Sequence, residues 1–289
     1  MNPAPSVIIF SVLSGAGFGL LAMLGAGFVL PVGWGAFFWW GLGYALAVAG
    51  LLAATFHLGN PKNAIRAFSQ WRSSWLSREA WAAVATLVLL APMALSDCLG
   101  LGWPRVIGQV GAGLALFTVC TTAMIYAQIR AVPRWHYWTT PALFLGFAVT
   151  GGLILTAQTL AVSGCMGLGA LMIMAFWLGD GRFAAVGVTL GSATGLGAIG
   201  IPSVFEQPHT GGNYLLREMI YVVGRKHATR LRVIAVVCAA LIPAMVLLLP
   251  LGWGSTGIAV VVHLLGAFAA RWLFFAEAEH VVGLYYGKR

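Results

Sequence analysis

The chain has 289 residues, of which 60% are hydrophobic and only 8% are charged, and its formal net charge is +9. Soluble domains carry roughly 25% charged residues, and disordered chains are poor in aliphatic and aromatic side chains, so both classes are excluded. A bilayer admits only helices or closed barrels, and long apolar runs without alternation favour helices. We therefore expect an all-α polytopic membrane protein. Because the basic residues gather in a few loops, the charge indicates a membrane topology, and we expect no nucleic-acid partner.

About eight membrane-spanning helices are expected, since one span takes about 20 residues. In chain order they cover residues 6–30, 35–57, 79–96, 105–130, 140–162, 164–179, 231–250 and 256–278. The division between the fifth and sixth is the weakest, because residues 163–165 make only a slight break. No room remains for a large soluble domain, so residues 1–289 are expected to form a single membrane-anchor domain.

The charged loops indicate an orientation. Loops at about 58–78, 131–139 and 180–230, with the C-terminus, hold fourteen of the sixteen basic residues: Lys62, Arg66, Arg72, Arg78, Arg130, Arg134, Arg182, Arg217, Arg225, Lys226, Arg230, Arg232, Lys288 and Arg289. Arg105 lies on the other side, and Arg271 lies within the last helix. The positive-inside rule then predicts a multi-pass inner-membrane protein with both termini in the cytoplasm. The same loops could instead be docking surfaces for a partner subunit.

The longest loop, at about 180–230, is expected to lie outside the membrane. It combines Gly, Pro and charged residues, and a short amphipathic helix is expected near residues 214–223. A loop of this length without regular structure is uncommon and usually has a function. Its basic residues are expected to face lipid phosphates or an acidic partner.

Two titratable residues are expected at the cytoplasmic face of consecutive helices. The second helix ends in TFHLGNP, which places His57 at its mouth. The third begins in WLSREAW, where Ser77 is a candidate N-cap and Glu79 lies in the first turn. An imidazole and a carboxylate beside aromatic walls suit a quinone, whose reduction by two electrons takes up two protons. The alternative is structural: His57 bonds a neighbouring carbonyl, and Glu79 favours the positive end of its helix.

Aromatic and basic side chains fill the loop between these two residues. Arg66, Trp71 and Arg78, together with Trp75, are candidates to line the mouth of the quinone site. They could equally be interfacial anchors, since Trp is enriched where membrane helices meet water.

The segment HLGNPKNAIRAFSQWRSSWLSRE resembles the signature of the DmsC-type membrane anchors of molybdenum oxidoreductases. The stretch AVPRWHYWTTP, at residues 131–141, is similar to a second element of that family. The resemblance extends over most of the chain, including the eight-helix plan. It implies that His57 and Glu79 carry the family's quinone-binding role. It also implies an anchor without its own catalytic centre, which passes electrons between a quinone and a four-cluster iron–sulfur subunit bound to a molybdopterin catalytic subunit.

Two further segments indicate a subgroup. The loop EQPHTGGNYLLREM and the terminal RWLFFAEAEHVVGLYYG look like those of SoeC-type anchors from sulfite-oxidising complexes. The charge count places the partner in the cytoplasm, which agrees with cytoplasmic sulfite oxidation. The alternative within the family is the anchor of a dimethyl sulfoxide or polysulfide reductase that oxidises menaquinol. The quinone is ubiquinone or menaquinone, and the sequence does not decide between them.

Other classes and residues complete the expectations. A secondary transporter is the alternative from another class, although no repeat of the HLGNP segment occurs. The four cysteines form no C-x-x-C, so no iron–sulfur cluster is expected in this chain. No haem is expected either, because a haem b between helices needs two axial histidines and only His263 is placed deep. Arg271 is expected to snorkel or to pair with Glu277 or Glu279, and Glu277 is expected to form a local pair with His280. A proton path or head-group contact through Arg271, Glu277 and His280 is the functional alternative.

Overall fold

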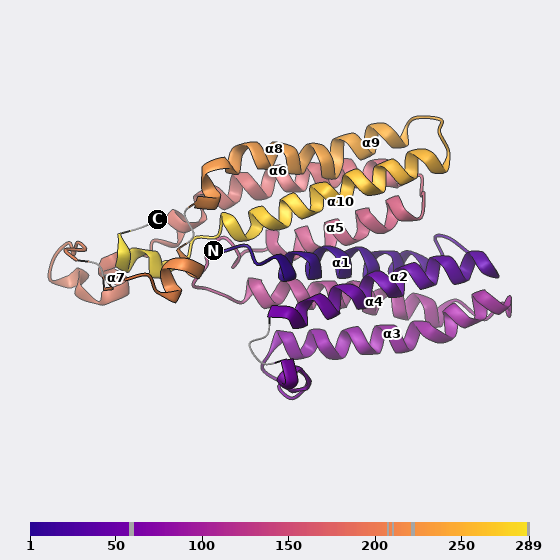
Figure 1. Ribbon diagram of the computed structural model, residues 1–289, viewed down its shortest axis with the longest axis horizontal. Helices are drawn as coiled ribbons and strands as arrows, with labels where there is room; N and C mark the ends of the chain where they lie inside the picture. The colour runs from indigo at the N-terminus through magenta and orange to yellow at the C-terminus, as the bar shows by residue number, and fades with distance from the viewer. Residues whose placement is uncertain (58–60, 207, 210, 221–222, 288–289) are drawn as a thin grey trace.

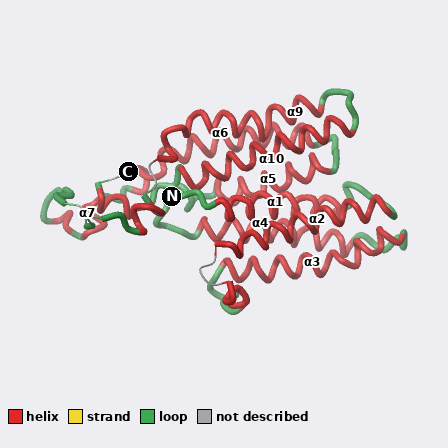
Figure 2. The backbone as a smooth tube through the Cα atoms, viewed as in Figure 1, coloured by secondary structure: helices red, strands yellow, loops and turns green. Residues whose placement is uncertain are grey.

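The computed structural model describes residues 1–57, 61–206, 208–209, 211–220 and 223–287. Within these residues the chain is built from helices and loops, without strands (Figure 2). The long helices run side by side along the longest axis of the molecule, and both termini lie at the same end (Figure 1). The all-α polytopic prediction is therefore confirmed.

Among the residues that the structure describes, seven helical stretches are long and apolar enough to cross a membrane. They comprise α1 (Pro5–Ala26), α2 (Trp34–Ala53) with η1 (Ala54–His57), α3 (Trp75–Leu99), α4 (Val106–Ala127), α6 (Ala161–Val186), the run α8 (Ala228–Val236), η6 (Val237–Leu241) and α9 (Ile242–Leu247), and α10 (Trp253–Ala276). An eighth helix, α5 (Thr139–Leu155), is apolar but has only 17 residues. At about 1.5 Å per residue, this length is at the lower limit for a span.

The first helix is the centre of the bundle. Helix α1 contacts α2, α4, α5 and α10, and it is buried on all sides over most of its length. Small residues permit this packing, because a Cβ at Gly19 would collide with the carbonyl of Ala148 on α5. Gly152 of α5 meets the backbone of Gly19 in the same way. In a membrane, where lipid is as apolar as leucine, close backbone contact is a main source of helix association.

Three boundaries differ from the expected ones. Helix α6 continues through Asp180 to Val186, because the charged side chains of this stretch find partners on neighbouring elements and need no loop. The break between the fifth and sixth helices falls at residues 156–160 and not at 163–165. Helix α3 begins at Trp75, so Glu79 lies in its second turn.

A π-helical turn, η6, interrupts the last-but-one span just before Pro243. Proline has no N–H to donate to the carbonyl four residues earlier. That carbonyl, of Ala239, accepts a hydrogen bond from Nδ1 of the buried His263 at 2.7 Å. His263 therefore connects α10 to the irregular turn.

The segment between α6 and α8 lies beyond the ends of the spans (Figure 1). It contains α7 (Leu190–Thr194), η3 (Leu196–Ala198), η4 (Leu215–Met219) and η5 (Val223–His227), and it packs near η7 (Val281–Tyr286). The amphipathic helix expected at 214–223 is only the short π-helix η4.

Candidate functional site

The loop before α3 is tied to the first turns of that helix. Ser77 was the expected N-cap, but it lies inside the helix, where its hydroxyl accepts a hydrogen bond from the backbone N–H of Gln70 at 3.2 Å. Arg78 donates to the carbonyl oxygens of Trp71 and Arg72 at 3.1 and 2.7 Å. Loop and helix thus form one structural unit that positions Trp71 and Glu79.

Glu79 points into the bundle. Its side chain is buried, and the hydroxyl of Thr122 on α4 donates a hydrogen bond to its Oε1. Deeper in the same helix pair, the hydroxyls of Thr86 and Thr118 are hydrogen-bonded at 3.1 Å. The two helices therefore share a polar seam that ends at Glu79. One carboxylate oxygen, Oε2, has no hydrogen bond from another described residue.

An open apolar groove of about 500 Å³ lies on the neighbouring face of α3. We call it the α3–α4 groove; its lining residues are Phe68, Trp71, Arg78, Trp81, Ala82, Ala85, Leu114 and Phe117. Trp81 holds its wall in place, because its indole N–H donates to the carbonyl of Phe68 at 3.0 Å. Arg78 lies 4.4 Å from the ring centre of Trp75, which orients the guanidinium at the rim.

The predicted quinone residues divide into three groups. Trp71 and Arg78 line the groove, and Glu79 lies behind it, about 100° around α3 from Arg78. Arg66 is exposed on η2 (Pro61–Phe68) and does not line the groove. His57 is the last residue of η1, but its side chain lies outside the described part of the structure, so its pairing with Glu79 remains a prediction.

Arg271 of α10 is buried, so the expectation that it snorkels is wrong. Its guanidinium carbon lies 3.4 Å from the ring centre of Phe144 and 5.5 Å from that of Phe147. Within the described residues no carboxylate lies in ion-pair range of it, so the expected pairing with Glu277 or Glu279 is also wrong. The cation is held by aromatic faces instead.

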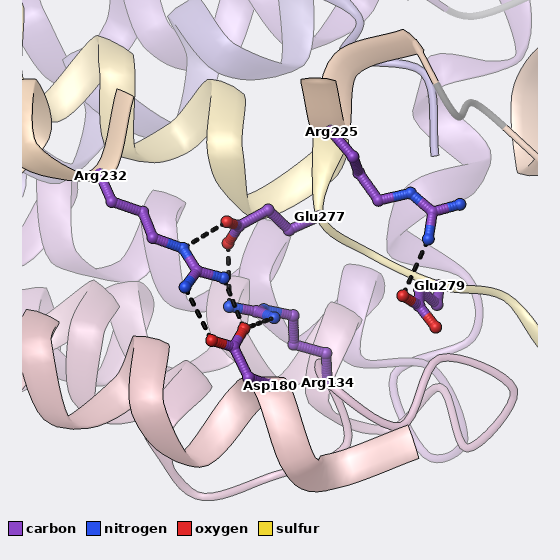
Figure 3. A network of polar contacts seen from close by, with 6 residues as sticks. All are labelled: Arg134, Asp180, Arg225, Arg232, Glu277 and Glu279. Carbon is purple, nitrogen blue, oxygen red and sulfur yellow. Dashed lines mark hydrogen bonds and ion pairs between the residues drawn. The ribbon is translucent and has the colours of Figure 1, made fainter. Parts of the chain in front are cut away.

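Glu277 belongs to a compact cluster of four charged residues (Figure 3). Arg134 and Arg232 both contact its carboxylate, and both also contact Asp180 of α6. This ion cluster is neutral overall, and it ties the loop before α5 to α6, α8 and the end of α10. Gly179 makes room for it, since a Cβ there would lie 2.8 Å from the guanidinium carbon of Arg134. A separate pair joins Arg225 to Glu279 at 2.8 Å.

His280 does not pair with Glu277, contrary to the sequence expectation. Its Nδ1 accepts a hydrogen bond from the backbone N–H of Val282 at 3.0 Å, which caps η7. Burial, together with the nearby amino terminus, lowers the pKa of His280 below its ordinary value. The ring is therefore neutral near pH 7, as its acceptor role requires.

Tyr126 connects the regions around Glu79 and Arg271. It lies four residues after Thr122 on α4, and its ring packs against that of Phe144, which the Arg271 guanidinium also contacts. Trp135, Phe144, Phe274 and Phe275 surround its ring at centroid distances of 5.3–5.8 Å. The sequence analysis did not single out Tyr126. Its position four residues after Thr122 could have indicated it, because this spacing places Thr122 and Tyr126 on the same face of α4.

A small cavity of about 50 Å³ lies between Arg271 and the ion cluster. Arg134, Thr139, Thr140, Arg271 and Glu277 are its polar lining residues, beside Phe147 and other apolar side chains. A cavity of this size with several polar partners has room for ordered water.

A buried ion pair at the opposite end of the bundle was also missed. Arg105 donates to both carboxylate oxygens of Asp97, at 3.1 and 2.8 Å, and the indole of Trp40 donates to the same carboxylate at 3.0 Å. This arrangement connects α2, α3 and the start of α4, which explains why the single basic residue on that side is needed there.

The sequence of the chain matches a known class of membrane protein. Residues 35–276 match the family described as "DMSO reductase anchor subunit (DmsC)", and the chain belongs to that family. It is 33% identical, over 99% of both chains, to the C subunit of the sulfite dehydrogenase of Allochromatium vinosum. No solved structure matches the chain. The family membership confirms the resemblance drawn from the HLGNP segment and places the chain among the membrane anchors of oxidoreductase complexes.

Proposed function

We propose that this chain is the quinone-reactive subunit of its complex, passing electrons between an iron–sulfur subunit and the membrane quinone pool. The observation that carries the proposal is that the buried Glu79 lies on α3 between Arg78 and Ala82, two residues that line the open, aromatic-lined α3–α4 groove. Ligand sites of this kind combine apolar walls with a few placed polar groups. An ionisable residue inside a membrane is by default a functional candidate.

The residues present fit a quinone. When bound, a quinone supplies a carrier for two electrons and two protons. The apolar groove would hold the quinone, with Trp71 and Arg78 among its lining residues available to its polar head. Thr122 occupies Oε1 of Glu79, which leaves Oε2 to hold or release a proton. His57, which the family resemblance pairs with Glu79, would be the second proton-exchanging group.

Arg271 is proposed to assist from the other side of Glu79. It contacts the Phe144 ring, as Tyr126 does, and it lines the small cavity together with Glu277. Water in that cavity, with the Tyr126 hydroxyl, would let protons move between the ion cluster and Glu79. Glu277 would form the outer end of this path, whereas His280, held by its bond to Val282, contributes no contact to the cavity.

We further propose that the electrons come from sulfite oxidised in the cytoplasm by a molybdopterin subunit and relayed through a four-cluster iron–sulfur subunit. The support is the sulfite dehydrogenase relative, together with the concentration of basic residues in the loops at one end. Basic loops mark the cytoplasmic side of a bacterial inner membrane. The anchor of a reductase for an external oxide would be expected to hold its partners on the opposite side.

The substitution Glu79→Gln tests the quinone role, because it keeps the shape of the side chain and removes the exchangeable proton. In the purified complex, we expect quinone-coupled turnover to fall by about 10²-fold or more, the typical contribution of a general acid or base. Oxidation of the substrate with a water-soluble dye, which bypasses this chain, should be unchanged.

Asp97→Asn is the matched control, since it neutralises another buried carboxylate on the same helix but at the far end. Its quinone turnover should stay within about threefold of wild type once the amount of assembled complex is equalised. Quinone turnover that persists in the Glu79 variant would place the site elsewhere in the chain.

A further inference from the structure

One apolar segment outside the bundle is exposed without any cover in this chain. It comprises residues 187–206, which include α7 and η3, and we call it the arm. Ile199 is 85% exposed, Ile201 is 100% exposed and Phe205 is 97% exposed. Burying large apolar side chains is worth about 1.5–3 kcal/mol each, so such exposure indicates a surface that is covered in the assembled state.

The arm has its own fixed structure. Thr189 and Ser192 form a reciprocal capping box at the start of α7. The hydroxyl of Tyr285 on η7 donates to the carbonyl of Ala193 at 2.9 Å, which attaches the arm to the C-terminal segment. These contacts fix α7, and Ile199, Ile201 and Phe205 follow it along the chain.

Lipid does not account for this exposure as it does for the spans. The spans lie along the long axis of the molecule, and α7 projects beyond their ends along the same axis (Figure 1). Apolar side chains on the spans, such as Trp253 at the other rim, face the bilayer. The arm extends away from the spans toward the aqueous phase. There, only another protein surface can bury its apolar side chains.

The charge around the arm indicates the chemistry of that surface. Between the arm and the end of the first turn of α8, the chain carries the exposed residues Arg217, Lys226 and Arg230, none of which pairs with a carboxylate within the described part of the chain. The arm itself has one charged residue, Glu206. A complementary partner therefore has an apolar cleft bordered by acidic residues.

We propose that the arm is the docking element for the water-soluble iron–sulfur subunit of the complex, with Ile199, Ile201 and Phe205 inserted into such a cleft. The inference rests on the proposed function, because it takes its partner from there. It adds the surface that holds the partner at the end of the bundle where the α3–α4 groove opens. Few central apolar anchors commonly dominate an interface of this kind.

Photo-crosslinking in the assembled complex tests this proposal. A benzophenone amino acid replaces Ile201, and in a control it replaces Trp253, which is 66% exposed at the opposite rim. On irradiation, the probe at position 201 should form an adduct that mass spectrometry identifies as the cluster-bearing subunit. The probe at position 253 should form no such adduct.

Three results would overturn the proposal: an adduct only with a second copy of this chain, an adduct only with phospholipid, or no adduct at all. As a second measurement, Ile201→Asp should reduce the iron–sulfur subunit retained after detergent extraction at least tenfold, whereas Trp253→Asp should leave it unchanged. Because crosslinking does not depend on turnover, its outcome is separable from that of Glu79→Gln.

Discussion

Glu79 is a carboxyl group in a position where a membrane helix ordinarily carries none. Its only described hydrogen-bond partner is the hydroxyl of Thr122, which comes from a different helix. The surrounding threonines bond mainly to backbone carbonyls of their own helix, so they add polarity to the seam without adding charge. A lone acid group in such a place can change its protonation state without breaking an ion pair.

Thr122→Val tests whether this hydrogen bond matters for the reaction. The substitution removes the donor to Glu79 and keeps the volume, so we expect quinone-coupled turnover to fall by about five- to tenfold, less than in Glu79→Gln. Thr121→Val is the control, because Thr121 is equally buried but donates only to the backbone carbonyl of Thr118. Equal rates in the two variants, measured in the purified complex, would argue against a role for Thr122.

Some of the site could be predicted at the residue scale, and some could not. Trp71 and Arg78 both line the α3–α4 groove, but their predicted role at the mouth of a quinone site stays a prediction. The partners of Arg271 and Glu277 were predicted wrongly, since spacing along one helix says nothing of the aromatic rings of α5 or the arginines of α8. Asp97 at the end of α3 pairs with Arg105 at the start of α4. Hydropathy alone does not predict this pair.

Among the elements, helix α6 continues through residues 180–186, where the sequence analysis expected a loop. A run with Asp180 and Arg182 looks like the end of a span, yet α6 continues because Asp180 meets Arg134 and Arg232 from neighbouring elements. The length of the apolar runs predicts that these helices exist. The residues at which the helices end depend on contacts with neighbouring elements. The break at residues 156–160 was missed, although Thr156, Gln158 and Thr159 make it more polar than the spans.

Glu277→Gln tests the ion cluster. The change leaves Arg134 and Arg232 sharing a single carboxylate, so we expect the free energy of unfolding to fall by about 2–3 kcal/mol. This is less than the 3–5 kcal/mol for a fully buried pair, because both arginines keep contact with solvent. Thermal unfolding of the purified complex in detergent measures the effect.

The control for that measurement is Glu206→Gln, an exposed acid on the arm, which should change the free energy by less than about 0.5 kcal/mol. If both variants unfold like wild type, the ion cluster does not contribute to the free energy of unfolding. If the Glu277 variant is stable but slow with quinone, its proposed role at the outer end of the proton path becomes the main one.

The whole molecule is polarised along its long axis. Both termini, the arm and the loop between α2 and α3 lie at one end of the bundle, as an even number of crossings requires (Figure 1). Most basic residues gather at that end, whereas Arg105 at the other end is neutralised by Asp97. The fold class could be predicted from composition and apolar length, whereas the number of membrane crossings and the orientation in the cell stay predictions.

Orientation can be measured with single cysteines in a variant whose four native cysteines are replaced by alanine. Ser69→Cys, in the exposed loop before α3, should react with a membrane-impermeant maleimide in inverted vesicles and not in intact spheroplasts. Gly102→Cys, in the loop between α3 and α4, should show the reverse. The opposite pattern would place the partner subunits outside the cytoplasm and would favour the reductase alternative.

The central claim is that a quinone binds between the loop before α3 and the ends of α3 and α4, and photolabelling tests it most directly. An azido-quinone is irradiated with the membrane-bound complex, and labelled peptides are mapped by mass spectrometry, with excess unmodified quinone as competitor. We expect competitor-sensitive label on peptides that contain Trp71, Trp81 or Phe117, and loss of that label in Glu79→Gln or Trp71→Ala. Specific label confined to α6, α9 or α10, unchanged in these variants, would contradict the claim.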